Sequence, residues 1–242
     1  MFCLIESERA PALRGVPPGV PGAGAPRLVA VDRGMWAVVA DAPLEHFAGD
    51  ELQEELREIE GISRHALAHA AVVEFFFRRA PVIPLKMFTL FSSDEAAREH
   101  VLGRRPQLAQ LFAGLRGMEE WGVRIVAGRV EEESSRRLSS GRDYLQVKKR
   151  LHDHTSAPPR ATVRAIAGAL AGLGKLASKT RKEAFPPPGK GRPYVAGASF
   201  LVRSDRRAAW HKAIATATAS LARQGHQLEM SGPWPPYHFV SN

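Results

Sequence analysis

The hydrophobic positions of the first forty residues fall into short runs that predict β-strands. Phe2–Ile5 is one such run, and Leu28–Val31 and Trp36–Val39 are two more. The last two are separated by Asp32-Arg33-Gly34, and the glycine can adopt the positive φ of a tight turn, so a hairpin is predicted. Arg14–Pro26 is too rich in proline and glycine for a helix or strand and predicts a surface loop.

A longer pattern follows, with apolar side chains at the alternating three- and four-residue steps of one helix face once polar Ser63 is allowed in one position. It predicts a single helix that is capped by Asp50 and ended by Pro81. Gly61 in its middle is expected to mark a close helix contact or a bend. The apolar positions are Leu52, Leu56, Ile59, Ala66, Ala70, Val73 and Phe77.

An extended segment and a second helical pattern complete the first half. Val82–Phe91 is mostly apolar, and Pro84 places it at a sheet edge or a bulge because proline cannot donate a ladder hydrogen bond. Asp94–Leu115 then reads as helix, interrupted near Gly103 and Pro106.

In the second half, strands and helices alternate. Trp121–Val130 predicts a strand because apolar residues alternate from Val123 onward. Further elements are predicted as helices over Arg142–His154, Arg160–Glu183 and Asp205–Arg223, the last capped at Ser204, and as strands over Tyr194–Val202 and Gln227–Met230. This order is typical of a ferredoxin-like layout.

Length and composition favour two small domains with cores of their own, because the chain has 242 residues of which 44% are hydrophobic. We predict the α+β class, with one domain over residues 1–118 and a second over 119–242. No run reaches the roughly 18 apolar residues that cross a bilayer, and Met1–Ile5 is too short for a signal peptide, so a cytosolic protein without a membrane partner is expected. The single cysteine, Cys3, is expected to be a small buried side chain.

The net charge of +9 comes from one segment. Arg142–Arg192 holds twelve Lys or Arg residues against three acids, whereas Glu45–Glu74 holds eight acids against two bases. These runs are either solvated helix faces or docking surfaces. A nucleic-acid-binding module that uses residues 142–192 is the alternative function, but only Tyr144 and Phe185 could stack on bases there, so nucleic acid is not the expected partner.

Candidate catalytic chemistry is sparse. His65 and His69 have the i, i+4 spacing of a metal-binding pair, but no glutamate follows His65 and no third ligand is apparent, which favours packing or surface histidines. Gly189-Lys190-Gly191 follows three prolines and lacks the strand–helix context of a phosphate loop. No catalytic, metal or cofactor site is therefore predicted.

The C-terminal tail, Ser231–Val240, combines three prolines with Trp234, Tyr237 and Phe239. Because prolines fix the path of the chain, the rings lose little entropy when they are held. Two interpretations stay open: the tail covers a sheet edge of its own domain, or it offers a rigid aromatic surface to a partner.

Three stretches resemble the gas vesicle protein L/F family (GvpL/GvpF): Trp36–Pro43, Ala80–Phe91 and the tail. Its ending, Gly-Pro-Trp-Pro-Pro-Tyr, is the most specific of them, and Glu119–Arg124 and Gly141–Leu145 fit in the same order. The sequence differs from the family at Lys86-Met87-Phe88, where Arg-Phe-Gly is common, and at Pro158-Pro159, which interrupts a usually longer helix.

This resemblance implies an N-terminal α+β domain followed by a ferredoxin-like domain, without enzymatic activity. It also implies a cytoplasmic role in gas vesicle assembly, through binding of the hydrophobic shell protein or other accessory proteins. We expect charged segments to orient the encounter and buried rings to prolong it. The expected partner-binding residues are Trp234, Pro235, Pro236, Tyr237, Phe239, Lys148, Lys149 and Arg150.

Overall fold

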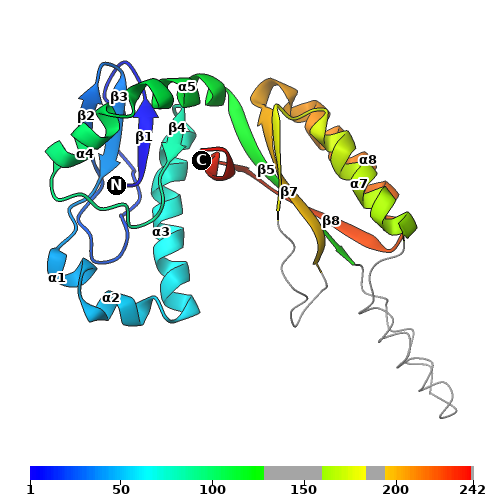
Figure 1. Ribbon diagram of the computed structural model, residues 1–242, viewed down its shortest axis with the longest axis horizontal. Helices are drawn as coiled ribbons and strands as arrows, with labels where there is room; N and C mark the ends of the chain where they lie inside the picture. The colour runs from blue at the N-terminus through cyan, green and yellow to red at the C-terminus, as the bar shows by residue number, and fades with distance from the viewer. Residues whose placement is uncertain (128–159, 184–193, 241–242) are drawn as a thin grey trace, which may run out of the picture. The chain divides into compact units, whose positions relative to one another are not determined.

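The computed structural model describes residues 1–127, 160–183 and 194–240 (Figure 1). Two compact units are present: unit 1 comprises Met1–Glu120 and Pro233–Asn242, and unit 2 comprises Trp121–Gly232. Each unit combines helices with a four-stranded sheet, which confirms the α+β class. The domain boundary at residue 118 stays a prediction. The predicted helix Arg142–His154 lies outside the described residues.

The sheet of unit 1 is antiparallel, with strand order β2-β3-β1-β4. Its strands are β1 (Cys3–Glu6), β2 (Arg27–Asp32), β3 (Met35–Val39) and β4 (Val82–Pro84). The predicted hairpin is confirmed, and Gly34 has the positive φ of 74° that its tight turn requires. Pro84 lies in the edge strand, as expected for a residue without an amide hydrogen.

The helix predicted from Asp50 to Phe77 is wrong as a single element. The chain forms α1 (Leu44–Phe47), α2 (Asp50–Glu55) and α3 (Ile59–Phe77) instead. A Cβ atom on Gly61 would lie 1.9 Å from the backbone oxygen of Glu55. The end of α2 therefore packs directly against the first turn of α3, and this confirms the close contact expected at the glycine.

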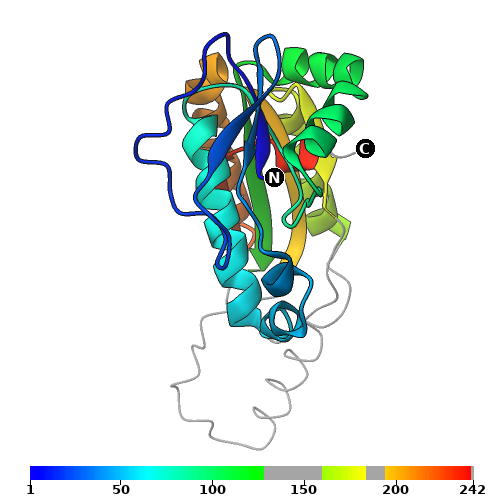
Figure 2. The same ribbon diagram turned by 90° about the vertical axis from the view of Figure 1, so that its left-hand side faces the viewer.

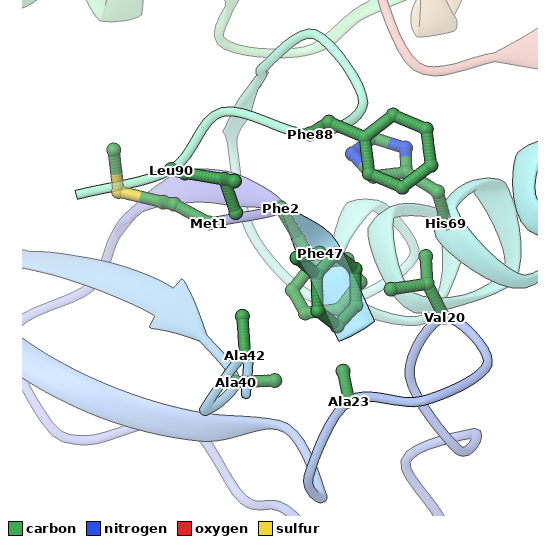
Figure 3. A pocket seen from close by; sticks show the side chains of 10 residues that line it. All are labelled: Met1, Phe2, Val20, Ala23, Ala40, Ala42, Phe47, His69, Phe88 and Leu90. Carbon is green, nitrogen blue, oxygen red and sulfur yellow. The ribbon is translucent and has the colours of Figure 1, made fainter. Parts of the chain in front are cut away.

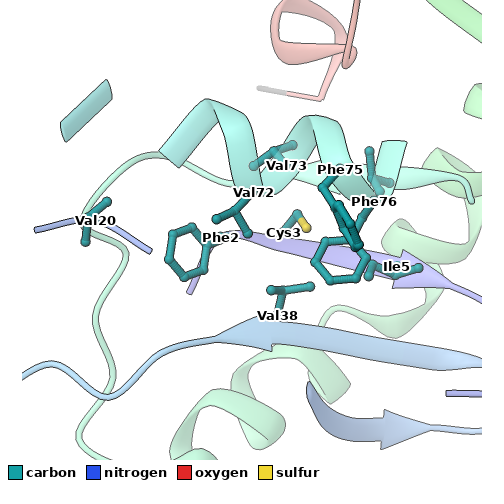
Figure 4. Packing of buried hydrophobic residues seen from close by; sticks show 10 residues of the cluster. Phe2, Cys3, Ile5, Val20, Val38, Val72, Val73, Phe75 and Phe76 are labelled. Carbon is teal, nitrogen blue, oxygen red and sulfur yellow. The ribbon is translucent and has the colours of Figure 1, made fainter. Parts of the chain in front are cut away.

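Helix α3 covers one face of the sheet, and α4 (Asp94–Leu102) and α5 (Arg105–Leu115) cover the other (Figure 2). The core under α3 joins Phe2, Cys3 and Ile5 to Val72, Val73 and Phe76 (Figure 4). Cys3 is fully buried, as predicted, and burial raises the pKa of its thiol. The expected interruption between α4 and α5 is confirmed.

The face of α3 that packs on the sheet differs from the predicted one. Ile59 was expected on the buried stripe but is 81% exposed. The buried residues of the helix are instead Gly61, His65, His69, Val72, Val73, Phe75 and Phe76. Both sides of α3 are apolar, so the periodicity alone could not distinguish the inner face from the outer one.

Unit 2 forms a sheet of strand order β6-β7-β5-β8, with α7 and α8 packed against it. Its elements are β5 (Met118–Ala127), α7 (Arg160–Gly174), β6 (Lys179–Lys182), β7 (Tyr194–Arg203), α8 (Arg207–Ala222) and β8 (His226–Trp234). Along the described residues the order of elements is strand, helix, strand, strand, helix, strand. Trp210 belongs to the core of this unit and is fully buried.

Two predicted helix limits in unit 2 are wrong. The helix expected to reach Glu183 ends at Gly174, and the following strand β6 pairs antiparallel with β7, Lys179 opposite Leu201. The four side chains of β6 are exposed, so the sequence has no alternation of apolar residues from which this strand could be predicted. Ser204 begins a 3₁₀ turn (Ser204–Arg206) and does not cap α8.

None of the helices within the described ranges combines the length and apolar character that a bilayer crossing requires.

Candidate functional site

The C-terminal tail leaves strand β8 at Trp234 and turns sharply. Pro235 and Pro236 are buried, and a 3₁₀ turn follows over Tyr237–Phe239. The amide of Tyr237 donates to the carbonyl of Pro235 at 2.7 Å, and the amide of Phe239 donates to that of Pro236 at 3.1 Å. The prolines therefore fix a compact path, as the sequence predicted.

This turn packs in unit 1. Tyr237 lies against the core cluster that contains Phe2, Cys3 and Phe76. By its contacts the tail from Pro233 onward is grouped with unit 1, whereas the sequence placed it in the domain over residues 119–242, and that division into domains stays a prediction. The hydroxyl of Tyr237 is buried, with no hydrogen-bond partner among the described residues, and burial raises its pKa.

A buried carboxylate anchors the turn. Glu120 is only 3% exposed, and its Oε2 accepts a hydrogen bond from the backbone amide of His238 at 2.9 Å. Its Oε1 lies 2.5 Å from Nδ1 of the same histidine. Because a carboxylate only accepts, Nδ1 is the nitrogen that carries the proton. The tail is thus held by directed bonds as well as by packing.

The predicted contact residues consequently separate into two groups. Pro235 and Pro236 are buried, and Tyr237 and Phe239 are half-buried, and a contact of these four with a partner stays a prediction. Trp234 is 39% exposed, and the side chain of His238 is 49% exposed, so both of these rings of the tail are open to solvent. Lys148, Lys149 and Arg150 lie outside the described residues.

Comparison with known proteins fits this architecture. The family model of gas vesicle synthesis protein GvpL/GvpF matches residues 1–241. The chain belongs to this family. A gas vesicle protein L from Streptomyces sp. is 26% identical over 239 residues, which cover 93% of this chain and 87% of that protein. The family resemblance seen in the sequence is confirmed.

Two crystal structures of GvpF share the fold. The protein from Anabaena sp. superposes with a TM-score of 0.67 over all of this chain and 94% of its own. The protein from Microcystis aeruginosa gives 0.66 over all of this chain and 98% of its own. Both are 14% identical to this chain, so the likeness concerns the fold.

The structure of this GvpL/GvpF family member shows why glycine suits position 88. Phe88, which stands where the family resemblance places glycine, is the one non-glycine residue with a positive φ, 61°, in the described ranges. Its ring compensates through contacts with His65 and Phe47, at centroid distances of 5.6 and 6.2 Å.

Replacing Phe88 separates backbone strain from ring packing. Phe88→Gly and Phe88→Ala both remove the ring contacts, but only glycine relieves the left-handed backbone. In urea titrations we expect the free energy of unfolding of Phe88→Gly to be about 1 kcal/mol higher than that of Phe88→Ala. Equal values for the two variants would contradict strain at this position.

His65 and His69 lie on the buried face of α3. The Nδ1 atom of His65 is 3.0 Å from the carbonyl oxygen of Gly61, one helical turn earlier. His69 stacks on Phe2 with ring centroids 5.4 Å apart. Across the described parts of the chain, no group of three or more His, Cys, Asp or Glu side chains could hold a metal ion. Both histidines are buried, so of the surface and packing positions that the sequence left open they occupy packing positions.

His69 also lines a small cavity with Phe2, Phe47 and Phe88 (Figure 3). The cavity volume is about 30 Å³, which suits a water molecule and is far below the several hundred Å³ of organic-ligand sites. Burial, and secondarily the nearby N-terminal amine, lower the pKa of His69 from 6.5 to about 4. The imidazole is consequently neutral in the folded protein near pH 7.

Acid should destabilise unit 1 through this histidine. The neutral ring of His69 contributes its full stability above pH 6.5, and that contribution is lost as the pH falls toward 4, because the unfolded chain takes up the proton first. We expect a loss of about 1–2 kcal/mol over this window, reduced from the full shift by partial solvation. Urea titrations across the window should show a shallower slope for His69→Gln, whereas equal slopes would contradict the assignment.

Proposed function

We propose that this GvpL/GvpF family protein is a non-catalytic accessory factor in gas vesicle assembly. It binds the hydrophobic shell protein or other accessory proteins, without a cofactor, and associates with gas vesicles in the cytoplasm. The observation that carries the proposal is the family match along residues 1–241. In addition, we infer that the two units act as domains, an N-terminal α+β domain and a C-terminal ferredoxin-like domain.

Physical chemistry supports an accessory factor that binds the shell protein before assembly. A subunit that exposes a large apolar surface before it joins a wall would associate non-specifically in water. A folded partner that covers such a surface for a time prevents this, and charged groups around the contact orient its approach. This chain offers an exposed Trp234 and two strongly charged segments of opposite sign.

Complementation tests the proposal directly. Cells that carry the complete gas vesicle gene set should lose intact vesicles when this reading frame is deleted, and should regain them when the full chain is supplied. The purified chain should then recover the shell protein or another accessory protein from the same cells. Intact vesicles in the deletion strain, together with no recovery, would overturn the proposal.

A nucleic-acid-binding role remains the second candidate because of the basic surplus between Arg142 and Arg192. Within the described part of that segment, strand β6 exposes Lys179, Arg181 and Lys182 at a sheet edge. Such a surface would give an affinity that falls steeply with salt. A titration with duplex and single-stranded oligonucleotides at low ionic strength decides the matter, since no binding there excludes this role.

A further inference from the structure

Helix α3 carries an apolar face that no described residue of unit 1 covers. Its inner side packs on the sheet through His65, His69 and Phe76, yet its outer side is apolar as well. Ile59 is 81% exposed, Ile62 43% and Leu67 71%, and Ser63 and Ala66 between them are also exposed. We call these five residues the outer face of α3. Glu60 and Arg64 are exposed on the same turns, so the face is an apolar strip beside charged side chains, and a contiguous exposed apolar patch of this kind marks an interaction site.

The outer face is continuous over the first half of the helix, from Ile59 to Leu67. Ile59, Ile62 and Ala66 follow one another at steps of three and four, and so do Ser63 and Leu67, so their side chains are neighbours. The small side chains of Ser63 and Ala66 lie between larger aliphatic ones. Of the seven large exposed hydrophobic residues in the described ranges, three belong to this face, which marks it as a patch and not as scattered exposure.

Acidic residues lie close in sequence to the N-terminal end of the face. Glu54, Glu58 and Glu60 are exposed, and none of them forms an ion pair with another described residue. Of the two bases in this stretch, Arg64 is engaged, since its guanidinium lies 3.0 Å from Glu55, and the exposed Arg57 offsets only one of the three acids. The surplus of acid is local, because the whole chain carries a net charge of +9. A cationic partner is therefore favoured at this site, and an anionic one is disfavoured.

We infer that the outer face of α3 is the docking surface for a helix of another protein that carries an aliphatic stripe flanked by Lys or Arg. Ridges at steps of three and four, with small residues between them, are the shape into which a second helix packs. The flanking positive charges would meet Glu54, Glu58 and Glu60. This inference deepens the proposed function by naming the contact surface and the chemistry of the partner.

Site-specific cross-linking tests the surface in the full chain. A photoreactive amino acid is placed at Leu67 in cells with the gas vesicle gene set, and at Val163 as a control, because Val163 is a 49% exposed apolar residue on α7. We expect an adduct from position 67, and none from position 163, to a basic amphipathic helix of another gas vesicle protein. Adducts confined to this chain, within one molecule or between two copies, would overturn the inference, as would the absence of adducts.

A defined probe gives the energetic test. A synthetic helical peptide of leucine and lysine, with the leucines on one face, should bind the purified full chain, and an isomer with scrambled order should not. The double variant Ile59→Ser/Leu67→Ser should weaken this binding about tenfold, whereas Val163→Ser should not change it. Equal affinity of the double variant and the wild type would contradict the inference. If the peptide does not bind but the full chain still complements the deletion strain, only the docking surface is rejected. The proposed function is then unaffected.

Discussion

Replacing Gly61 with alanine is expected to lower the free energy of unfolding by about 2 kcal/mol, although alanine normally stabilises a helix. The added Cβ would lie 1.9 Å from the carbonyl oxygen of Glu55 and 2.8 Å from its carbonyl carbon. Both are backbone atoms, so no side-chain rotation relieves the overlap. The junction between α2 and α3 would have to open, and the contact between Gly61 and Nδ1 of His65 would move with it.

Gly114→Ala is the matched control, because Gly114 also lies in a helix, α5, but a Cβ there has no atom within 4 Å. This variant should gain about 0.5–1 kcal/mol from the reduced freedom of the unfolded chain. Urea titrations of the two variants should therefore move in opposite directions from the wild type. A stabilised Gly61→Ala variant would show that α2 does not pack against the start of α3.

Local chemistry made several features of unit 1 predictable. A glycine at the hairpin turn and a proline in the edge strand act through their own backbone geometry, which depends little on the rest of the fold. Gly34 and Pro84 were therefore placed correctly from the sequence. Gly61 was recognised as unusual for the same reason, but the turn at Leu56–Glu58 was missed because apolar spacing continues across it.

Features that depend on distant partners could not be predicted. Which side of α3 is buried depends on the shape of the sheet beneath it. As a result, two histidines are buried on the inner face, whereas Ile59 is exposed. Strand β6 forms because its backbone pairs with the edge of β7. A run of exposed Lys and Arg residues has no apolar alternation that would predict such a strand. Within the candidate site, the rigid path of the tail followed from its prolines, but its place depends on Glu120, which precedes His238 by 118 residues.

Tyr237→Ala is expected to lower the free energy of unfolding of unit 1 by about 3 kcal/mol, because the ring fills a place beside the core of that unit. Trp234→Ala should change stability by less than about 1 kcal/mol, since its ring is 39% exposed and lies before the buried turn. Thermal and urea unfolding measure both effects. Partner recovery from cells with the gas vesicle gene set should respond in the opposite way, with the larger loss for Trp234→Ala.

Tyr237→Phe distinguishes packing from recognition at this position. The buried hydroxyl has no hydrogen-bond partner among the described residues, so its removal should leave stability unchanged or raise it by up to about 1 kcal/mol. A partner that bound the hydroxyl would instead be lost with no change in unfolding. If Tyr237→Ala were as stable as the wild type but bound the partner less well, the ring would belong to a binding surface. The hydrogen bond between Glu120 and the amide of His238 would then hold the turn without the ring of Tyr237.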